Sequence, residues 1–217
     1  AIDTVTLGKG KIHWAKVWFD DIGDSAARSL AAWPHETWRY EYCGDKRYRF
    51  AADSSKITGA SFIPTRLLSL GHGMNATNTN IGGWNDSAMR EFCNGRVYDA
   101  FPTEWKSIIK KVQIPASAGN RTSDIVYSKD YVYLPSYAEV FATHEYEDPY
   151  TSEGKIITFF NTDADRVKTM NGAASIWYLR SAEVSYNTYF RSVSAQGNMN
   201  GYVVSSRSLG ICPCISI

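Results

Sequence analysis

The end of the chain limits its fold more than any other feature, because residues 174–217 contain short apolar stretches and turns but no helical pattern. Four stretches enriched in β-branched and aromatic residues follow one another there: ASIWYLRS, TYFRSVS, GYVVSS and GICPCISI. Turn residues such as Gln196-Gly197-Asn198 separate them, as in chains that form consecutive short strands. We therefore expect a small antiparallel sheet in this part of the chain.

Two helices are expected before this sheet. The first, over residues 86–94, has an apolar face at helical spacing made of Met89, Phe92 and Cys93. Asn85 or Asp86 is expected to cap its first amides, and Asn94-Gly95 to end it. The second, over residues 102–111, begins with a proline, and its apolar stripe consists of Trp105, Ile108, Ile109 and Val112.

The remaining elements are expected from weaker patterns. Strands are predicted at residues 11–19, 47–52, 60–68 and 125–135, and a short helix at residues 25–32. Ser136 and Glu139 have the spacing of a capping box, which predicts another short helix. The remaining segments are predicted to be irregular: the Gly- and Asn-rich loop 69–83, residues 114–124, and residues 142–172 apart from KIITFF.

Charge and cysteine content argue against several classes of protein. The chain carries 23 basic and 22 acidic side chains, and this balance gives no electrostatic footprint for nucleic acid. No apolar stretch approaches the roughly 18 residues of a membrane span, so no membrane insertion is expected. The four cysteines are too sparse for a disulfide-built scaffold, and we expect buried free thiols at Cys43, Cys93, Cys212 and Cys214.

The motifs that suggest a metal or a catalytic site are incomplete. Trp84-Asn85-Asp86 is the tripeptide with which calcium-dependent C-type lectins hold a sugar-binding calcium ion, but no Glu-Pro-Asn or Gln-Pro-Asp motif accompanies it. Residues 161–165, NTDAD, lack the Gly and Glu spacing of an EF-hand loop. A nucleophile elbow and a Walker loop are missing, and the four histidines are scattered. We therefore expect no metal, no cofactor and no catalytic residues.

Tyrosine is abundant, and it clusters with Ser, Asn and Gly near the end of the chain. The sequence contains 14 Tyr, 7 Trp and 9 Phe. Most Trp and Phe residues are expected in the core. Tyr mixed with Ser, Asn and Gly is instead typical of binding loops, where rigid amphipathic rings lie beside adaptable hydrogen-bonding groups.

Three separated blocks resemble an uncharacterised domain that is common in gut bacteria and their prophages. The hallmarks are a Gly-Gly-Trp before a Met-Arg helix, a Pro-Ser-x-x-Glu-Val segment and a Trp-x-Leu-Arg-Ser strand. In this chain they are Gly82-Gly83-Trp84 with Met89-Arg90, residues 135–140, and residues 177–181.

The closing block also resembles the C-terminal half of the C-type-lectin-like fold. The resemblance is to the branch that includes formylglycine-generating enzymes and the variable proteins of diversity-generating retroelements. In those variable proteins a Trp-containing strand is followed by surface positions rewritten to Tyr, Asn, Ser and similar residues, and then by a final buried strand. The resemblance implies a ligand-binding surface at residues 181–208. The matching residues are Trp177, Ser185, Tyr186, Asn187, Tyr189, Asn198, Asn200, Tyr202, Ser205, Ser206 and Ser208.

The enzymatic relatives in this branch use two cysteines in the closing region to bind copper and oxidise a substrate cysteine. Cys212 and Cys214 lie late in the chain, but they flank a proline. Strand rise would place them about 7 Å apart on one side of the strand. Because this spacing is too wide for two thiolates to share one copper ion, an oxidase is the alternative interpretation and not the leading one.

The expected fold is α+β and C-type-lectin-like, with two main helices packed on small twisted antiparallel sheets. Residues 61–217 would form this domain, and residues 1–60 its first strands or an appended element that contacts other virion or surface proteins. We expect a non-enzymatic, phage- or prophage-encoded variable protein: a tail-tip adhesin or receptor-binding protein on a virion tail or bacterial cell surface. It would engage a host-cell-surface protein or glycan without calcium. The alternatives are a copper-dependent formylglycine-generating-type oxidase and a structural surface module without a ligand.

Overall fold

The computed structural model describes most of the chain between residues 12 and 216. For the residues that precede Ile63, and for Glu104, Tyr150, Thr151 and Tyr202, only the course of the main chain is described. The residues described are 12–17, 36–45, 49–50, 53–57, 60–64, 66–68, 70–101, 103–141, 150–154, 156–157 and 160–216. The helix predicted at residues 25–32 lies outside these residues.

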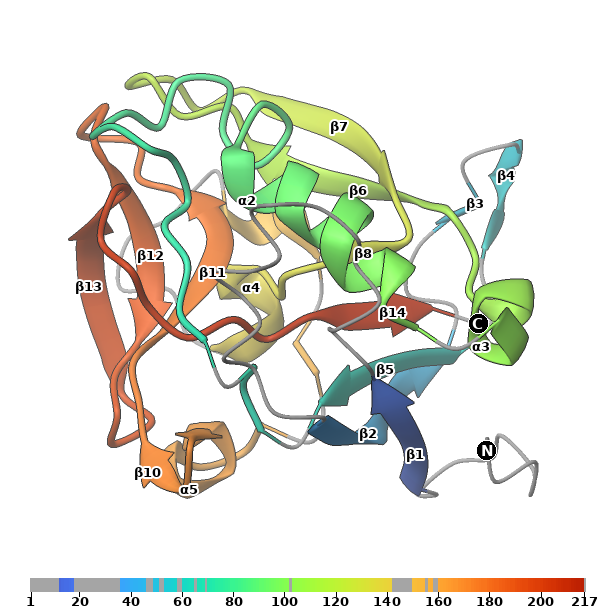
Figure 1. Cartoon of the computed structure of the whole chain (residues 1–217). Helices are drawn as coiled ribbons and strands as arrows, with labels where there is room; N and C mark the ends of the chain where they lie inside the picture. Colours follow the sequence, from blue (N-terminus) through green and yellow to red (C-terminus); the bar gives the residue numbers. More distant parts are fainter. Residues whose placement is uncertain are drawn as a thin grey trace.

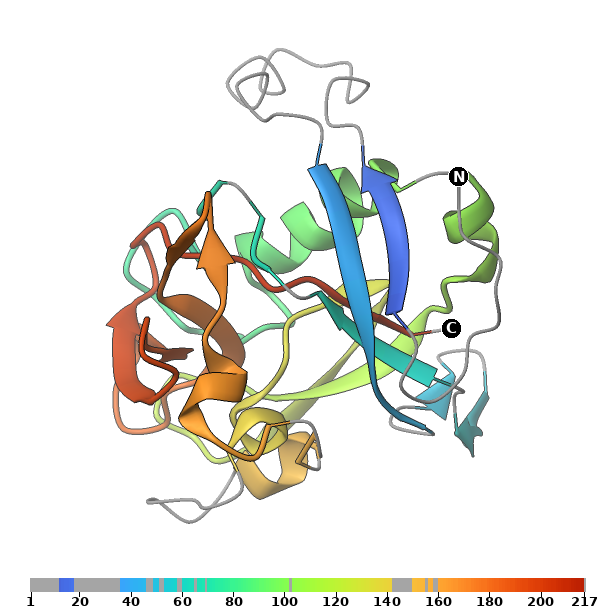
Figure 2. The same ribbon diagram turned by 90° about the horizontal axis from the view of Figure 1, so that it is seen from below.

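The sheet with the most strands combines segments from both ends of the chain (Figure 1). Its order is β1-β2-β5-β14-β8, and Figure 2 shows β1 and β2 side by side. The strands span Ile12–Val17, Glu36–Asp45, Ala60–Pro64, Cys214–Ser216 and Val132–Tyr133. The last strand, β14, lies between β5 and β8 and is buried along its length. The closing segment is therefore an interior strand, and the early strands share its sheet.

The other sheets are smaller. One has the order β4-β3-β6-β7, with strands Asp53–Ile57, Arg49–Phe50, Val112–Ser117 and Ile125–Asp130. A second contains β11, β12 and β13, which span Trp177–Ala182, Tyr189–Val193 and Met199–Val204. The third is the hairpin of β9 (Thr169–Met170) and β10 (Ala173–Ala174). Every pair of these named strands is antiparallel, so the chain is an α+β protein with small antiparallel sheets and few helices.

The first predicted helix is present, but its ends differ from the prediction. Helix α2 (Ala88–Phe92) is capped by Ser87, whose hydroxyl accepts a hydrogen bond from the Arg90 amide. The prediction that Asn85 or Asp86 caps it is wrong, because both residues belong to the preceding turn. Several residues with high cap preference stood in a row here, and sequence alone did not show which one adopts the extended backbone of a cap.

Asn94-Gly95 does not end this helix. The chain continues into a π-helical turn, η1 (Cys93–Val97), before it leaves the helix. The Asn94 side chain instead reaches across to strand β8, where it accepts from the Tyr131 amide at 2.7 Å and donates to the Val132 carbonyl at 2.9 Å. A tertiary contact therefore overrides the local tendency of Asn-Gly to stop a helix.

The second predicted helix is shorter than expected. Helix α3 covers Thr103–Ile108, and Val112 already begins strand β6. The prediction of a loop over residues 114–124 is wrong for its first part, because β6 continues to Ser117. The sequence did not indicate this strand because it contains Pro115, and proline has no N–H to donate to the hydrogen-bond ladder of a sheet. It is tolerated because β3 pairs only with the first residues of β6, at Val112 and Gln113.

Four short features lie among the described residues of the stretch 137–174: two helices, a 3-10 turn and a hairpin. Helix α4 (Tyr137–Val140) confirms the predicted capping box, in which Ser136 and Glu139 bond to each other's main-chain amides. Helix α5 (Asp163–Arg166) and the β9–β10 hairpin were not predicted, nor was the 3-10 turn η2 (Tyr150–Glu153). The hairpin turns on Asn171-Gly172, both at positive φ, which is a common geometry for two-residue hairpin loops.

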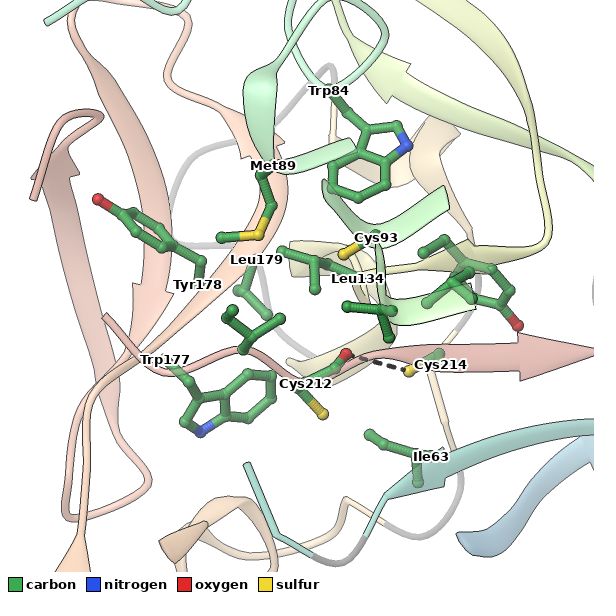
Figure 3. Close-up of a cluster of buried hydrophobic side chains, with 14 of the residues drawn as sticks. Ile63, Trp84, Met89, Cys93, Leu134, Trp177, Tyr178, Leu179, Cys212 and Cys214 are labelled. Atoms are coloured by element: carbon green, nitrogen blue, oxygen red, sulfur yellow. Dashed lines mark hydrogen bonds between the residues drawn. The ribbon is translucent and has the colours of Figure 1, made fainter. Parts of the chain in front are cut away.

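The core brings together side chains from Ile63 to Ile215, and Figure 3 shows part of it. Trp84, Trp105 and Trp177 are almost completely buried, as expected. Cys93, Cys212 and Cys214 are buried free thiols, which confirms the prediction for these three; the Cys43 side chain is outside the described residues. Among the described residues, no helix is long and apolar enough to span a bilayer.

Candidate functional site

The Gly-Gly-Trp and Met-Arg motifs contribute residues to a buried polar cluster around Asp130. Trp84 donates its indole N–H to the Asp130 carboxylate at 2.8 Å, and the Arg90 guanidinium donates to the other carboxylate oxygen at 2.7 Å. The Ser128 hydroxyl donates to the same carboxylate. Gly83 has a φ of 58° and lies against the Ser117 carbonyl, so a Cβ would collide there. The Gly-Gly-Trp and Met-Arg motifs therefore hold the start of α2 against β7.

The other two motifs meet around Arg180, which is completely buried. Its guanidinium donates to the Glu139 carboxylate at 2.8 Å and to the Leu134 carbonyl at 2.8 Å. The hydroxyl of Ser181 accepts from the Tyr137 amide at 2.8 Å. All three motifs thus contribute to the buried scaffold of the domain.

Glu153, on turn η2, joins this second cluster although no sequence motif indicated it. Its carboxylate accepts from the Ser117 amide at 2.6 Å and from the Ser181 hydroxyl. The carboxyl is fully buried, and burial raises its pKa despite the opposing effects of nearby Arg180 and of these hydrogen bonds. Glu153 therefore links the ends of β6 and β11.

Four loop segments that carry exposed residues lie side by side at one end of the β11–β13 sheet. We call them together the loop surface: residues 76–81, 120–122, 185–189 and 206–208. In Figure 1 these segments lie above and beside β12 and β13, at the upper left. Hydrogen bonds between the segments, centred on Asn80 and Ser205, hold them side by side.

Asn80 is the main support of this surface and is completely buried. Its side-chain oxygen accepts from the Asn120 amide at 2.9 Å, and its own main-chain amide donates to the Asn187 carbonyl at 2.8 Å. Its side-chain amide lies 2.7–2.9 Å from three main-chain carbonyls, those of Glu183, Tyr186 and Tyr189. The turn at Asn120 is unusual, since Gly119, Asn120 and Arg121 all have positive φ.

Ser205 supports the other side of the loop surface. Its buried hydroxyl accepts from the Thr79 amide at 2.8 Å and donates to the Thr77 carbonyl at 3.0 Å. Its main-chain amide donates to the Thr188 carbonyl at 2.9 Å. Ser205 therefore lies beneath the surface and positions it.

The base of the 183–188 loop is also fixed by a buried ion pair. Glu183 and Arg191 lie 2.7 Å apart, and both side chains are at most 5% exposed. The second oxygen of the Glu183 carboxylate accepts from the Ser185 amide at 3.0 Å. These contacts with residues 185–188 thus use main-chain atoms of the loop, while the side chains of Ser185 and Tyr186 are exposed.

Six of the residues predicted for ligand binding lie in the loop surface. Tyr186 is 45% exposed, and its ring meets the ring of Tyr189 edge-on at 5.5 Å. Ser185, Ser206 and Ser208 are exposed, and Asn187 is half-buried. The loop surface also includes residues that the sequence did not indicate: Ile81, which is 56% exposed, and Asn78, Asn120 and Arg121.

The other five predicted residues are not together with these. Trp177 is buried and donates its indole N–H to the Arg166 carbonyl, so it offers no contact area at the surface. Ser205 is buried, as described. Asn198 lies in the turn at the far end of the β12–β13 hairpin, about 15 Å away by strand rise. Asn200 bonds to the Ser192 hydroxyl, and the side chain of Tyr202 is outside the described residues.

The geometry around the late cysteines does not fit a copper-dependent oxidase. Cys212 and Cys214 are at most 2% exposed, and the Cys214 thiol donates to the Cys212 carbonyl (Figure 3). A substrate cysteine could not reach either thiol without opening the core. In the part of the chain that the structure describes, no group of three or more His, Cys, Asp or Glu side chains has the arrangement of a metal site.

These features define an α+β domain. The residues of its three sequence motifs take part in polar clusters in the interior, and its loops carry exposed polar and aromatic residues. A family model described as a domain of unknown function, DUF6273, matches residues 58–217. The chain therefore belongs to the DUF6273 family. No curated protein and no solved structure matches the chain significantly. All four segments of the loop surface lie within the matched region.

Proposed function

We propose that this protein binds a macromolecular ligand through the loop surface. The observation that carries the proposal is the way residues 185–188 are held. Asn80, Glu183 and Ser205 fix this loop through its main-chain atoms, while the side chains of Ser185 and Tyr186 are exposed to solvent. A surface of this kind keeps its shape while its side chains supply the contacts.

The residue types on the loop surface support binding. Tyr186 and Ile81 supply exposed apolar area, and Tyr189 limits the rotation of the Tyr186 ring by edge contact. Tyrosine contributes a large contact area at a small cost in side-chain entropy. Ser185, Asn78 and Ser206 add exposed hydrogen-bonding groups to the same surface, and this mixture of residue types is typical of binding loops.

The resemblance of the closing block to variable proteins of diversity-generating retroelements supports a more specific proposal. The protein acts as a variable receptor-binding protein or tail-tip adhesin of a phage or prophage, with a C-type-lectin-like fold. Its ligand is a host-cell-surface protein or glycan. Several copies on one particle would raise the effective affinity by orders of magnitude, so a weak single site is sufficient for attachment.

We propose that this binding does not use calcium. Asn85 and Asp86 are the residues of the lectin-like tripeptide, and the Asn85 amide donates to the Asp86 carboxylate at 2.6 Å. They lie in the turn before α2, and Trp84 points into the core, toward Asp130. The expected ligand contacts come from the side chains of residues 185–187 instead.

The test is binding of a fluorescent tetramer of the chain to a printed glycan array and to an array of purified bacterial surface proteins. The proposal predicts at least one bound feature, with a signal that falls tenfold or more for the variant Tyr186→Ala/Tyr189→Ala. Tyr127→Ala is the matched control, because Tyr127 is 60% exposed but lies on β7, outside the loop surface. Binding that persists in the double variant, or a tetramer that binds no feature on either array, would contradict the proposal.

A further inference from the structure

The Glu153 carboxylate lies directly beneath the two strand ends that lead into the loop surface. Ser117 ends β6 and is followed by the turn that contains Asn120. Ser181 is next to the end of β11, and the 183–188 loop follows. Glu153 accepts hydrogen bonds from both Ser117 and Ser181, so one carboxylate joins the bases of two loop-surface segments.

The groups around this carboxylate determine how it responds to a proton. Its hydrogen-bond donors, a main-chain amide and a hydroxyl, are both neutral. Arg180 on β11 donates to the Glu153 main-chain carbonyl and forms its ion pair with Glu139 on α4, and its charge opposes the effect of burial on the pKa of Glu153. Tyr133 of β8 also interacts electrostatically with Arg180. The Glu153 carboxylate is therefore completely buried without a direct ion pair among the described residues.

We propose that Glu153 is a proton-sensitive support of the loop surface, a role that rests on the proposed function. When the carboxyl is protonated, the ends of β6 and β11 stay docked on η2. When it ionises, a charge is confined in the protein interior, and opening of these strand ends to water relieves it. The loop surface is consequently better ordered at acidic pH than at alkaline pH.

The direction of this pH dependence follows from the linkage between proton binding and folding. Burial raises the pKa of Glu153 above its ordinary value of 4.5 in the folded protein. The folded state therefore holds its proton more tightly than the open state. Its stabilising effect is complete below pH 4.5 and is lost as pH rises through the raised pKa. Each pH unit in this window changes the open population by at most about tenfold.

The test measures amide hydrogen exchange of Ser117, residues 118–122 and residues 183–188 from pH 4.5 to pH 8, corrected for the intrinsic pH dependence of exchange. Protection should fall with rising pH in the wild type and should lose this dependence in Glu153→Gln. Glu91→Gln is the control, because Glu91 is exposed on α2. A flat profile in the wild type, or an unchanged slope in Glu153→Gln, would overturn the proposal.

If Glu153→Gln does not fold, the titration midpoint of the Glu153 carboxyl in the wild-type protein, measured by 13C NMR, tests the proposal instead. A Glu153 midpoint at or below 4.5 overturns the proposal, and a clearly higher midpoint with matching loss of Ser117 protection supports it. No ligand is used in either measurement. The failure of this inference is therefore distinguishable from the failure of the binding proposal, which depends only on the arrays.

Discussion

Replacement of Asn80 by alanine should destabilise the protein strongly, because one buried side chain bonds to four main-chain groups in two loops. The variant loses the bond to the Asn120 amide and those to the carbonyls of Glu183, Tyr186 and Tyr189. Only the bond to Glu183 is fully buried, so water can replace part of the others. With about 1 kcal/mol for each partly exposed bond and about 2 kcal/mol for the buried one, the loss is roughly 3–5 kcal/mol.

The assay is thermal and urea unfolding of Asn80→Ala beside Asn187→Ala. A loss of 3–5 kcal/mol lowers the Tm by roughly 6–20 °C for a chain of this size. Asn187 is the matched control: it is half-buried, and Asn80 contacts only its main-chain carbonyl, which alanine keeps. Its replacement should cost less than about 0.5 kcal/mol. Equal losses in the two variants, or an Asn80→Ala variant as stable as the wild type, would refute the role of Asn80.

Further substitutions should separate scaffold from surface. Gly119→Ala should cost about 2 kcal/mol or more in urea unfolding, because φ is +67° and a Cβ would overlap the Asn80 carbonyl; a stable variant would contradict this. Trp84→Phe should cost about 1–3 kcal/mol, since it leaves the Asp130 carboxylate without its indole donor; an unchanged midpoint would show that the bond is dispensable. Ser205→Ala should raise the exchange rate of the Thr79 amide, read by NMR, whereas Ser206→Ala should leave it unchanged.

Local chemistry was sufficient to predict several elements. The capping box at Ser136 and Glu139 is confirmed because all of its donors and acceptors lie within four residues of one another. The C-terminal strands are also confirmed, since turn residues such as Gly197, at positive φ, mark their limits clearly. Two features that sequence patterns missed depend on distant partners: the strand β6 that contains Pro115, and the helix that continues past Asn94. The β9–β10 hairpin and α5 were missed although their contacts are local.

The candidate site divides in the same way. The resemblance of the closing block indicated the exposed residues Ser185 and Tyr186, but it also included Trp177 and Ser205, because residue type alone does not reveal which way a side chain faces. Asn80 could not have been found from local patterns, since its side-chain acceptors lie 103, 106 and 109 residues further along the chain. The only sequence signal near it was the length of the Gly- and Asn-rich loop.

The central claim is that side chains of the 185–188 loop bind a ligand but do not hold the fold. It is tested most directly by yeast display of all substitutions at Ser185, Tyr186 and Asn187. For each variant, binding of the ligand found on the arrays is divided by the number of displayed molecules that resist protease. The account predicts that substitutions at Tyr186 reduce binding per folded molecule while display stays at the wild-type level. If binding and protease-resistant display fall together at these positions, the loop is part of the scaffold and the claim is contradicted.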